Sequence, residues 1–292
     1  MPLIAAILSH RREYLPARCL AFMITVFMSA SPAHAVSMTN MSAFTTNLLK
    51  PSGVAVTSDG GFWVANQGSC YQNSLSGCSA TAKLVYNNGS KTRTIGGFLG
   101  LSGVAVDSKG NAWVSDIGAN KVFHVTKGGY IDVILYDPNS IVIDGPLSVA
   151  VDSNDNVYVA NRNDQAITVF NSSGTFLKYW KVKMNLFYLA IDSQDRIWYA
   201  DAQNNTINCL QCGTSFPVKD KSAPRALTVD PDGNVWVANY TYSNVTIYTP
   251  YGKPLGTVKL GVRYPTGVAF DPDGNLYVSN FTTNTVTIYS VQ

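Results

Sequence analysis

The chain has 292 residues, of which 46% are hydrophobic and 13% are charged, and this composition excludes an intrinsically disordered protein. Its net charge is +3, and residues 1–35 contribute three Arg and one Glu, so the 21 basic and 18 acidic residues become 18 and 17 without them. So balanced a chain argues against electrostatic binding of nucleic acid or of an anionic membrane surface.

Residues 1–35 have the three parts of an export signal: a basic stretch through Arg18, an apolar run over residues 19–28, and small residues ending at Ala35. The apolar run is about half as long as a membrane-spanning helix, so we expect a protein that is not membrane-integral. We predict cleavage after Ala35 and a secreted or periplasmic protein. Arg11 and Arg12 resemble a twin-arginine motif, and that export route stays open beside general secretion.

Six segments repeat one pattern: a short apolar strand, a polar turn, and a second strand with a central aromatic residue and a final Asn or Asp. Successive copies start 38 to 50 residues apart, and a third strand follows each of them. A period of about 40 residues with up to four short strands is typical of a propeller blade. The copies are GVAVTSDGGFWVAN from Gly53, GVAVDSKGNAWVSD from Gly103, SVAVDSNDNVYVAN from Ser148, YLAIDSQDRIWYAD from Tyr188, ALTVDPDGNVWVAN from Ala226 and GVAFDPDGNLYVSN from Gly267.

The first two strands of each copy are apolar at consecutive positions, so both faces of each sheet must be buried between neighbouring blades. The last copy has only three strands, whereas an extended stretch at residues 43–49 precedes the first copy. We therefore predict an all-β, six-bladed β-propeller over residues 36–292, with four-stranded blades and a ring closed by this N-terminal strand. Six mid-strand aromatics should be wedges between blades: Trp63, Trp113, Tyr158, Trp198, Trp236 and Tyr277.

The segments PSGVAVTSDGGFWVAN from Pro51 and PTGVAFDPDGNLYVSN from Pro265 closely resemble the repeat core of the NHL-repeat propellers. The resemblance covers roughly residues 43–290. It implies the architecture but not the function, because this fold serves enzymes, recognition modules and structural proteins. Related propellers include calcium-dependent lactonases of the gluconolactonase type, streptogramin lyases and peptidylglycine lyases.

One face of the predicted ring carries the loops before the first strand and after the second strand of each blade; we name it the loop face. The final Asn or Asp of each second strand should lie there, in a polar ring around one mouth of the central channel. Alternatively, these side chains only hydrogen-bond loop backbone, as they commonly do at strand ends. The six residues are Asn66, Asp116, Asn161, Asp201, Asn239 and Asn280.

Aromatic residues and arginines of the flanking loops should gather on the same face, where they suit recognition of a partner. The alternative is that Pro224-Arg225 and Tyr264-Pro265 only pack the blade entrances. The candidate ligand-binding or partner-binding residues are Arg162, Phe187, Arg225, Tyr240, Tyr242, Tyr264 and Phe281.

Four cysteines follow residue 35, and export would place them where disulfides persist. Cys70 and Cys78 bracket an enlarged loop of the first blade, whereas Cys209 and Cys212 flank a turn after a third strand. We expect two local disulfides. Neither a second CxxC nor a neighbouring His accompanies Cys209, so the sequence does not indicate a zinc site there.

The turns on the opposite face include DPDGN at Asp230 and at Asp271. They share Asp and Gly with calcium-binding loops but lack the Glu that closes such a loop. We therefore expect ordinary hairpin turns at both places.

After residue 35 the chain has no Glu and only one His, His124, so the ligand sets of the related enzymes do not carry over. We favour a monomeric binding scaffold without a cofactor, which holds a protein or glycan ligand on the loop face. An Asp-based enzyme stays open, in which Asp116, Asp144 and Asp201, together with Asn161 and Asn239, bind a calcium ion that polarises a lactone or ester carbonyl. A purely structural envelope protein is a third alternative.

Overall fold

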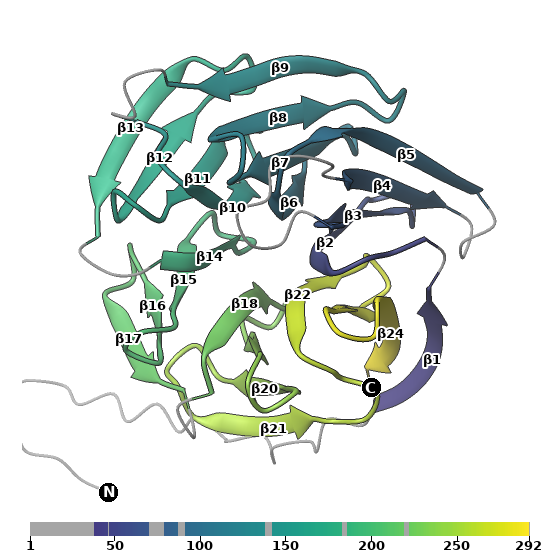
Figure 1. Ribbon diagram of the computed structural model, residues 1–292. Helices are drawn as coiled ribbons and strands as arrows, with labels where there is room; N and C mark the ends of the chain where they lie inside the picture. The colour runs from purple at the N-terminus through teal and green to yellow at the C-terminus, as the bar shows by residue number, and fades with distance from the viewer. Residues whose placement is uncertain are drawn as a thin grey trace, which may run out of the picture. The chain divides into compact units, whose positions relative to one another are not determined.

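The computed structural model describes residues 38–45, 47–69, 79–86, 91–137, 142–182, 186–218 and 222–291. The chain divides into two units, Met1–His34 and Ala35–Gln292, and the described residues all belong to the second, which is compact. Within this unit the described residues form strands and turns but no helix, and Figure 1 shows their six sheets arranged around a common axis. The predicted all-β, six-bladed propeller is confirmed.

Each sheet is an antiparallel blade of four strands, and we number the blades one to six from β2 onward. The innermost strands are β2 (Pro51–Val56), β6 (Leu101–Val106), β10 (Pro146–Val151), β14 (Leu186–Ile191), β18 (Pro224–Val229) and β22 (Pro265–Phe270). The second strands are β3 (Phe62–Asn66), β7 (Ala112–Asp116), β11 (Val157–Asn161), β15 (Ile197–Asp201), β19 (Val235–Asn239) and β23 (Leu276–Asn280). The third strands are β4 (Ala80–Tyr86), β8 (Lys121–Val125), β12 (Ala166–Phe170), β16 (Thr206–Cys209), β20 (Asn244–Tyr248) and β24 (Thr285–Val291). The outer strands are β5 (Lys91–Phe98), β9 (Ile131–Tyr136), β13 (Phe176–Lys181), β17 (Thr214–Pro217), β21 (Pro254–Val258) and β1 (Met38–Phe44).

The core lies between the blades. Every residue of the six second strands is buried, and the six mid-strand aromatics are at most 9% exposed, as the wedge interpretation predicts. Trp236 meets Phe270 of the next blade edge to face, with ring centroids 5.1 Å apart. An aromatic side chain of this kind buries roughly 150–250 Å², which contributes about 4–6 kcal/mol before the entropy of ordering is subtracted.

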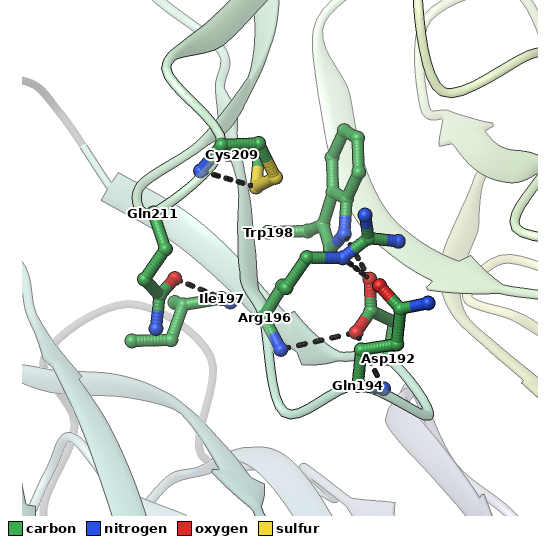
Figure 2. Close-up of a disulfide and its surroundings, with 8 residues drawn as sticks. Asp192, Gln194, Arg196, Ile197, Trp198, Cys209 and Gln211 are labelled. Carbon is green, nitrogen blue, oxygen red and sulfur yellow. Dashed lines mark hydrogen bonds and ion pairs between the residues drawn. A yellow bond between two sulfur atoms is a disulfide. The ribbon is translucent and has the colours of Figure 1, made fainter.

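In blade four the aromatic of the second strand also holds the turn between the first two strands. Trp198 Nε1 donates a 2.8 Å hydrogen bond to Asp192 Oδ2, and Oδ1 of the same carboxylate accepts from the backbone N–H groups of Gln194 and Arg196 (Figure 2). Burial alone would raise the pKa of Asp192, but these hydrogen bonds outweigh it and lower the pKa. The turn carboxylate is therefore a structural acceptor.

The DPDGN segment in blade five follows the same pattern, which confirms the expected hairpin turn. Asp230 accepts hydrogen bonds from the backbone and side-chain amides of Asn234 and from Trp236 Nε1. Gly233 takes φ +83°, a left-handed conformation that costs glycine little.

The N-terminal strand closes the ring, as predicted, but its bounds differ from those expected. β1 pairs antiparallel with β24, from Met38 opposite Val291 to Phe44 opposite Val286, whereas residues 45 and 47–50 form no strand. These residues must turn from the outside of blade six to the inside of blade one. The backbone N–H groups of Leu49 and Lys50 bind side chains instead of a neighbouring strand.

Cys209 and Cys212 are joined by a disulfide across the turn after β16, with Cα atoms 5.3 Å apart, within the range that such a bond allows (Figure 2). The backbone N–H of Cys212 points to Cys209 Sγ. The expected Cys70–Cys78 pair and the export signal at residues 1–35 lie outside the described residues. Within the described residues, no helix has the length and hydrophobicity needed to span a membrane.

Candidate ligand-binding site

A β-bulge recurs at the loop-face end of every innermost strand. In blade one, Pro51 pairs with Asn66 and Gly53 with Ala65, which leaves Ser52 as an extra residue. Bulges of this kind redirect a side chain, and they are frequent beside functional sites. The bulge residues are Ser52, Ser102, Leu147, Phe187, Arg225 and Thr266.

The bulge residues meet a second set at the channel mouth, made of the residues that directly follow the second strands. Together they enclose a cavity of about 200 Å³ at the loop face, which we name the mouth cavity. Two arginines, Arg162 and Arg225, contribute to it from blades three and five. The cavity is lined by Ser52, Gln67, Ser102, Ile117, Leu147, Arg162, Tyr188, Arg225, Thr266 and Phe281.

Hydroxyl groups in the wall of the cavity hold neighbouring blades together. Ser52 Oγ donates to Leu101 O at 2.8 Å, Ser102 Oγ to Pro146 O at 3.1 Å, and Thr266 Oγ1 to Pro51 O at 2.6 Å. Each bond runs from one innermost strand to the next around the ring. These hydroxyl protons are therefore used in structure.

Tyr188 closes the floor of the mouth cavity. Its hydroxyl reaches across the channel to two carbonyl oxygens, Ser52 O at 3.0 Å and Ser102 O at 2.9 Å. Burial raises the pKa of Tyr188 to about 12, with the charge of Arg225 acting in the opposite direction, so the hydroxyl stays a donor at physiological pH. The other five blades have a small residue at the corresponding position: Gly53, Gly103, Ser148, Ala226 and Gly267.

Beyond Tyr188 the channel continues toward the opposite face between the six innermost strands. A small cavity of about 50 Å³ lies directly beneath the tyrosine, and a cavity of about 290 Å³ follows it. Aliphatic side chains of all six innermost strands line the latter, among them Val54, Val104 and Leu227. The tyrosine thus divides the channel into the mouth cavity and an inner space.

Arg225 and three aromatic side chains form a cluster on one side of the mouth. The guanidinium Cζ of Arg225 lies 3.9 Å from the ring centre of Tyr240, in cation–π contact. Tyr240 in turn packs edge to face against Tyr264 at 5.1 Å and Phe281 at 6.2 Å. Arg162, on the far side of blade four, is exposed. Within the described residues, neither arginine forms an ion pair.

The predicted polar ring lies beside the mouth cavity but does not line it. All six side chains are at most 4% exposed and turn into their own loops, because strand-end backbone N–H groups there need acceptors. The carbonyl oxygens of Asn66, Asn161 and Asn280 accept from backbone N–H groups of the preceding loops. Asn239 accepts from Ser222 Oγ. The six side chains thus follow the alternative interpretation, in which strand-end Asn and Asp hydrogen-bond their loops. In four blades, the residue that directly follows the strand-end Asn or Asp lines the mouth cavity.

The two aspartates of the ring bind the backbone in the same way. Asp116 accepts from the N–H groups of Leu99 at 2.7 Å and Ala119 at 2.9 Å, one at each oxygen. Asp201 accepts from the N–H groups of Gln203 and Asn204. Both carboxylates are fully buried, and no cluster of three or more His, Cys, Asp or Glu suited to a metal occurs among the described residues. This donor set does not fit the calcium site of the Asp-based enzyme.

Other predicted residues are placed as follows. Arg162, Arg225 and Phe281 line the mouth cavity, whereas Tyr240 and Tyr264 stand beside it, with Tyr264 41% exposed. Tyr242, on the same loop as Tyr240, is 52% exposed. Phe187 occupies a bulge position, and its side chain lies outside the described residues.

Sequence reasoning missed Tyr188, although a signal was present. Five of the six repeats begin with Gly, Ser or Ala, and the fourth begins with Tyr188. A large residue at a position that is otherwise small indicates that its side chain enters the space that the other blades leave open.

Two family patterns match parts of the chain. The pattern described as SMP-30/Gluconolactonase/LRE-like region matches residues 180–282, and the NHL repeat pattern matches residues 143–170. No curated protein is detectably similar to the sequence.

Solved propellers resemble the whole unit. A streptogramin B lyase has 15% identity and a TM-score of 0.65, over 88% of this chain and 98% of that chain. A virginiamycin B lyase from Staphylococcus aureus has 14% identity and a TM-score of 0.62, over 87% and 98%. The WD40 β-propeller domain of Doa1 has 12% identity and a TM-score of 0.63, over 87% and 97%. At such identities the likeness shows the fold alone.

Proposed function

We propose that this six-bladed β-propeller, part of which matches the NHL repeat pattern, is a binding module that holds its ligand at the loop-face mouth. The observation that carries the proposal is the mouth cavity itself: about 200 Å³ in volume, floored by Tyr188 and flanked by Arg162, Arg225 and Phe281. Concave sites with a few convergent polar groups are typical of ligand binding.

The ring suits such a role because its binding groups stand on rigid strands. Arg225 and Tyr188 belong to innermost strands, and serine and threonine hydroxyls tie these strands to their neighbours. Little conformational freedom is then lost when a ligand binds, which favours affinity.

We further propose that the protein works outside the cytoplasm as a monomer, after cleavage near Ala35, with a protein or glycan as its partner. The tripartite pattern of residues 1–35 supports export. Mass spectrometry of the N-terminus of the exported protein tests this, and an N-terminus at Val36 is expected.

The gluconolactonase-like match makes a lactonase or a lyase the second candidate function. The described residues support it less well, because the oxygens of Asp116 and Asp201 are engaged by backbone N–H groups. His124, the one histidine after residue 35, lies in β8 between Asp107 and Asp132. Calcium titration by calorimetry on metal-free protein tests this candidate, and we expect no saturable site that Asp201→Ala abolishes.

The binding proposal is tested on peptide and glycan arrays with the wild-type chain and two variants of the mouth, Arg225→Ala and Phe281→Ala. Lys109→Ala is the matched control, because Lys109 is an exposed cation in a turn on the opposite face. We expect ligands that both mouth variants lose and the control retains. Binding that all three variants retain would exclude the loop-face mouth as the site.

A further inference from the structure

The mouth cavity is lined by two arginines, Arg162 and Arg225, and among the described residues its lining contains no Asp or Glu. The predicted carboxylates Asp116 and Asp201 are buried and accept from loop N–H groups. Asp144 accepts a hydrogen bond from the side chain of Asn163. The charged side chains in the described lining are therefore both cationic, which favours an anionic ligand.

Most other polar groups of the wall are already engaged. The hydroxyls of Ser52, Ser102 and Thr266 donate to carbonyl oxygens of neighbouring strands, and Tyr188 donates to two more. A ligand in the cavity thus finds hydrogen-bond donors chiefly on the guanidinium groups, which are forked and permanently charged. Such donors bind carboxylate or phosphate groups more strongly than neutral acceptors.

Apart from Gln67, the rest of the described lining is apolar. Ile117 and Leu147 project from blades two and three, Phe281 from blade six, and the ring of Tyr188 forms the floor. A hydrated sugar would leave these surfaces poorly matched, whereas an aromatic or branched aliphatic group would remove them from water.

On the basis of the proposed binding function, we infer that the mouth cavity takes an organic anion: a carboxylate or phosphate head group on an apolar body about as large as one aromatic ring. The head group binds Arg162 and Arg225, and the body lies against Ile117, Leu147 and Phe281. The aromatic cluster of Tyr240 and Tyr264 supports Arg225 from behind and keeps its guanidinium oriented.

The inference is tested by isothermal calorimetry on the full chain with four probes of similar size. Phenylacetate and phenyl phosphate carry the two head groups, phenylacetamide is the neutral counterpart, and glucuronate is an anion with a polar body. We expect the better of the two aromatic anions to bind at least about 10-fold more tightly than the amide and than glucuronate. The preferred head group distinguishes carboxylate from phosphate recognition.

Three variants locate the binding. Arg162→Met and Arg225→Met should each weaken the preferred anion by about 10-fold or more, and Lys109→Met on the opposite face should leave it unchanged. Arg162 is exposed, so its variant folds even if Arg225→Met loses stability, which thermal melting measures. Raising the salt concentration should weaken the anion and leave the amide unaffected.

Three results would overturn the inference: no aromatic anion bound at millimolar concentration, equal binding of phenylacetamide, or equal binding of glucuronate. The proposed function is judged separately. A neutral array ligand that depends on Phe281 but not on the arginines would keep the binding module and refute the organic anion. Conversely, array ligands that every mouth variant still binds would refute the mouth as the site of the binding module. An anion titration that gives the expected result would then still support the organic anion.

Discussion

The indole Nε1 of Trp236 donates a 2.9 Å hydrogen bond to Asp230 Oδ2, six residues earlier in the chain, and so links the wedge of blade five to the turn of the same blade. Trp113, at the corresponding position of blade two, has a buried Nε1 without a partner among the described residues. In blade two the turn carboxylate, Asp107, accepts from His124 instead.

The two tryptophans form a matched pair for measuring this bond. Trp236→Phe removes a hydrogen bond to a carboxylate, whereas Trp113→Phe removes an unsatisfied donor, and both lose similar indole area. We expect Trp236→Phe to reduce the free energy of unfolding by about 1.5–3 kcal/mol more than Trp113→Phe. Urea denaturation of both variants measures the difference. Equal losses would show that the bond adds nothing to the packing of the ring.

His124 should make the stability of blade two depend on pH. Burial would lower the pKa of His124, but hydrogen bonds to Asp107 and Asp132 outweigh burial and raise the pKa. A pKa that is higher in the folded state contributes stability that is complete below the unfolded value near 6.5 and disappears as pH rises through the folded value. The free energy of unfolding should therefore decrease as the pH rises through the pKa of His124 in the folded state.

His124→Gln is the variant that isolates the effect. The stability difference between wild type and variant should be larger at pH 5.5 than at pH 9, as measured by urea denaturation at both pH values. At more acidic pH the contribution of Asp107, whose pKa is lowered despite burial, is lost as pH falls through that value. A pH-independent difference would mean that the imidazole is not protonated in the folded protein.

Ring closure by β1 should be essential for stability. Deletion of residues 38–44 leaves blade six with three strands and exposes the edge of β24. It also removes Phe44, whose ring packs edge to face on Phe62 at 5.7 Å. We expect a loss of several kcal/mol, which is roughly 10 °C in melting temperature for a unit of this size.

A synthetic peptide spanning residues 36–46 provides the control for that deletion. Added to the truncated chain, it should restore the melting temperature in a concentration-dependent way, because it binds the folded form only. A peptide with Pro at position 43 should not, because Ala43 pairs with Thr287 in the ladder. Rescue by both peptides would argue against strand pairing as the cause.

Tyr188→Phe tests the floor of the mouth cavity. The change removes the donor to Ser52 O and Ser102 O while keeping the ring, and we expect a loss of about 1–2 kcal/mol. Tyr179 lies on the outer strand β13, and its hydroxyl donates to Asp164. Tyr179→Phe removes that bond and is the comparison for a peripheral hydrogen bond. A smaller loss at Tyr188 than at Tyr179 would refute a central role for the tether.

The blade architecture could be predicted because each of the six repeats carries the same pattern. Consecutive apolar residues and a mid-strand aromatic require a sheet that is buried on both faces. The closing strand was located only approximately, since residues 38–42 lack the apolar pattern of an inner strand. At the mouth, the sequence named both Asn161 and its neighbour Arg162. The side chain of Asn161 bonds the backbone of its loop, whereas Arg162 lines the cavity. Residue type does not separate these two roles, because Asn suits both a strand-end acceptor and a binding group.

The pairing of β1 with β24 also governs the order in which the chain folds. Met38 finds its partner only when Val291 has emerged from the ribosome, so during synthesis the sixth blade is the last that can be completed. Bringing these ends together costs about 5 kcal/mol of chain entropy if nothing between them is ordered. Blades one to five lower that cost by folding first, and the finished circle then behaves as one cooperative body in which damage at either terminus is felt by every blade.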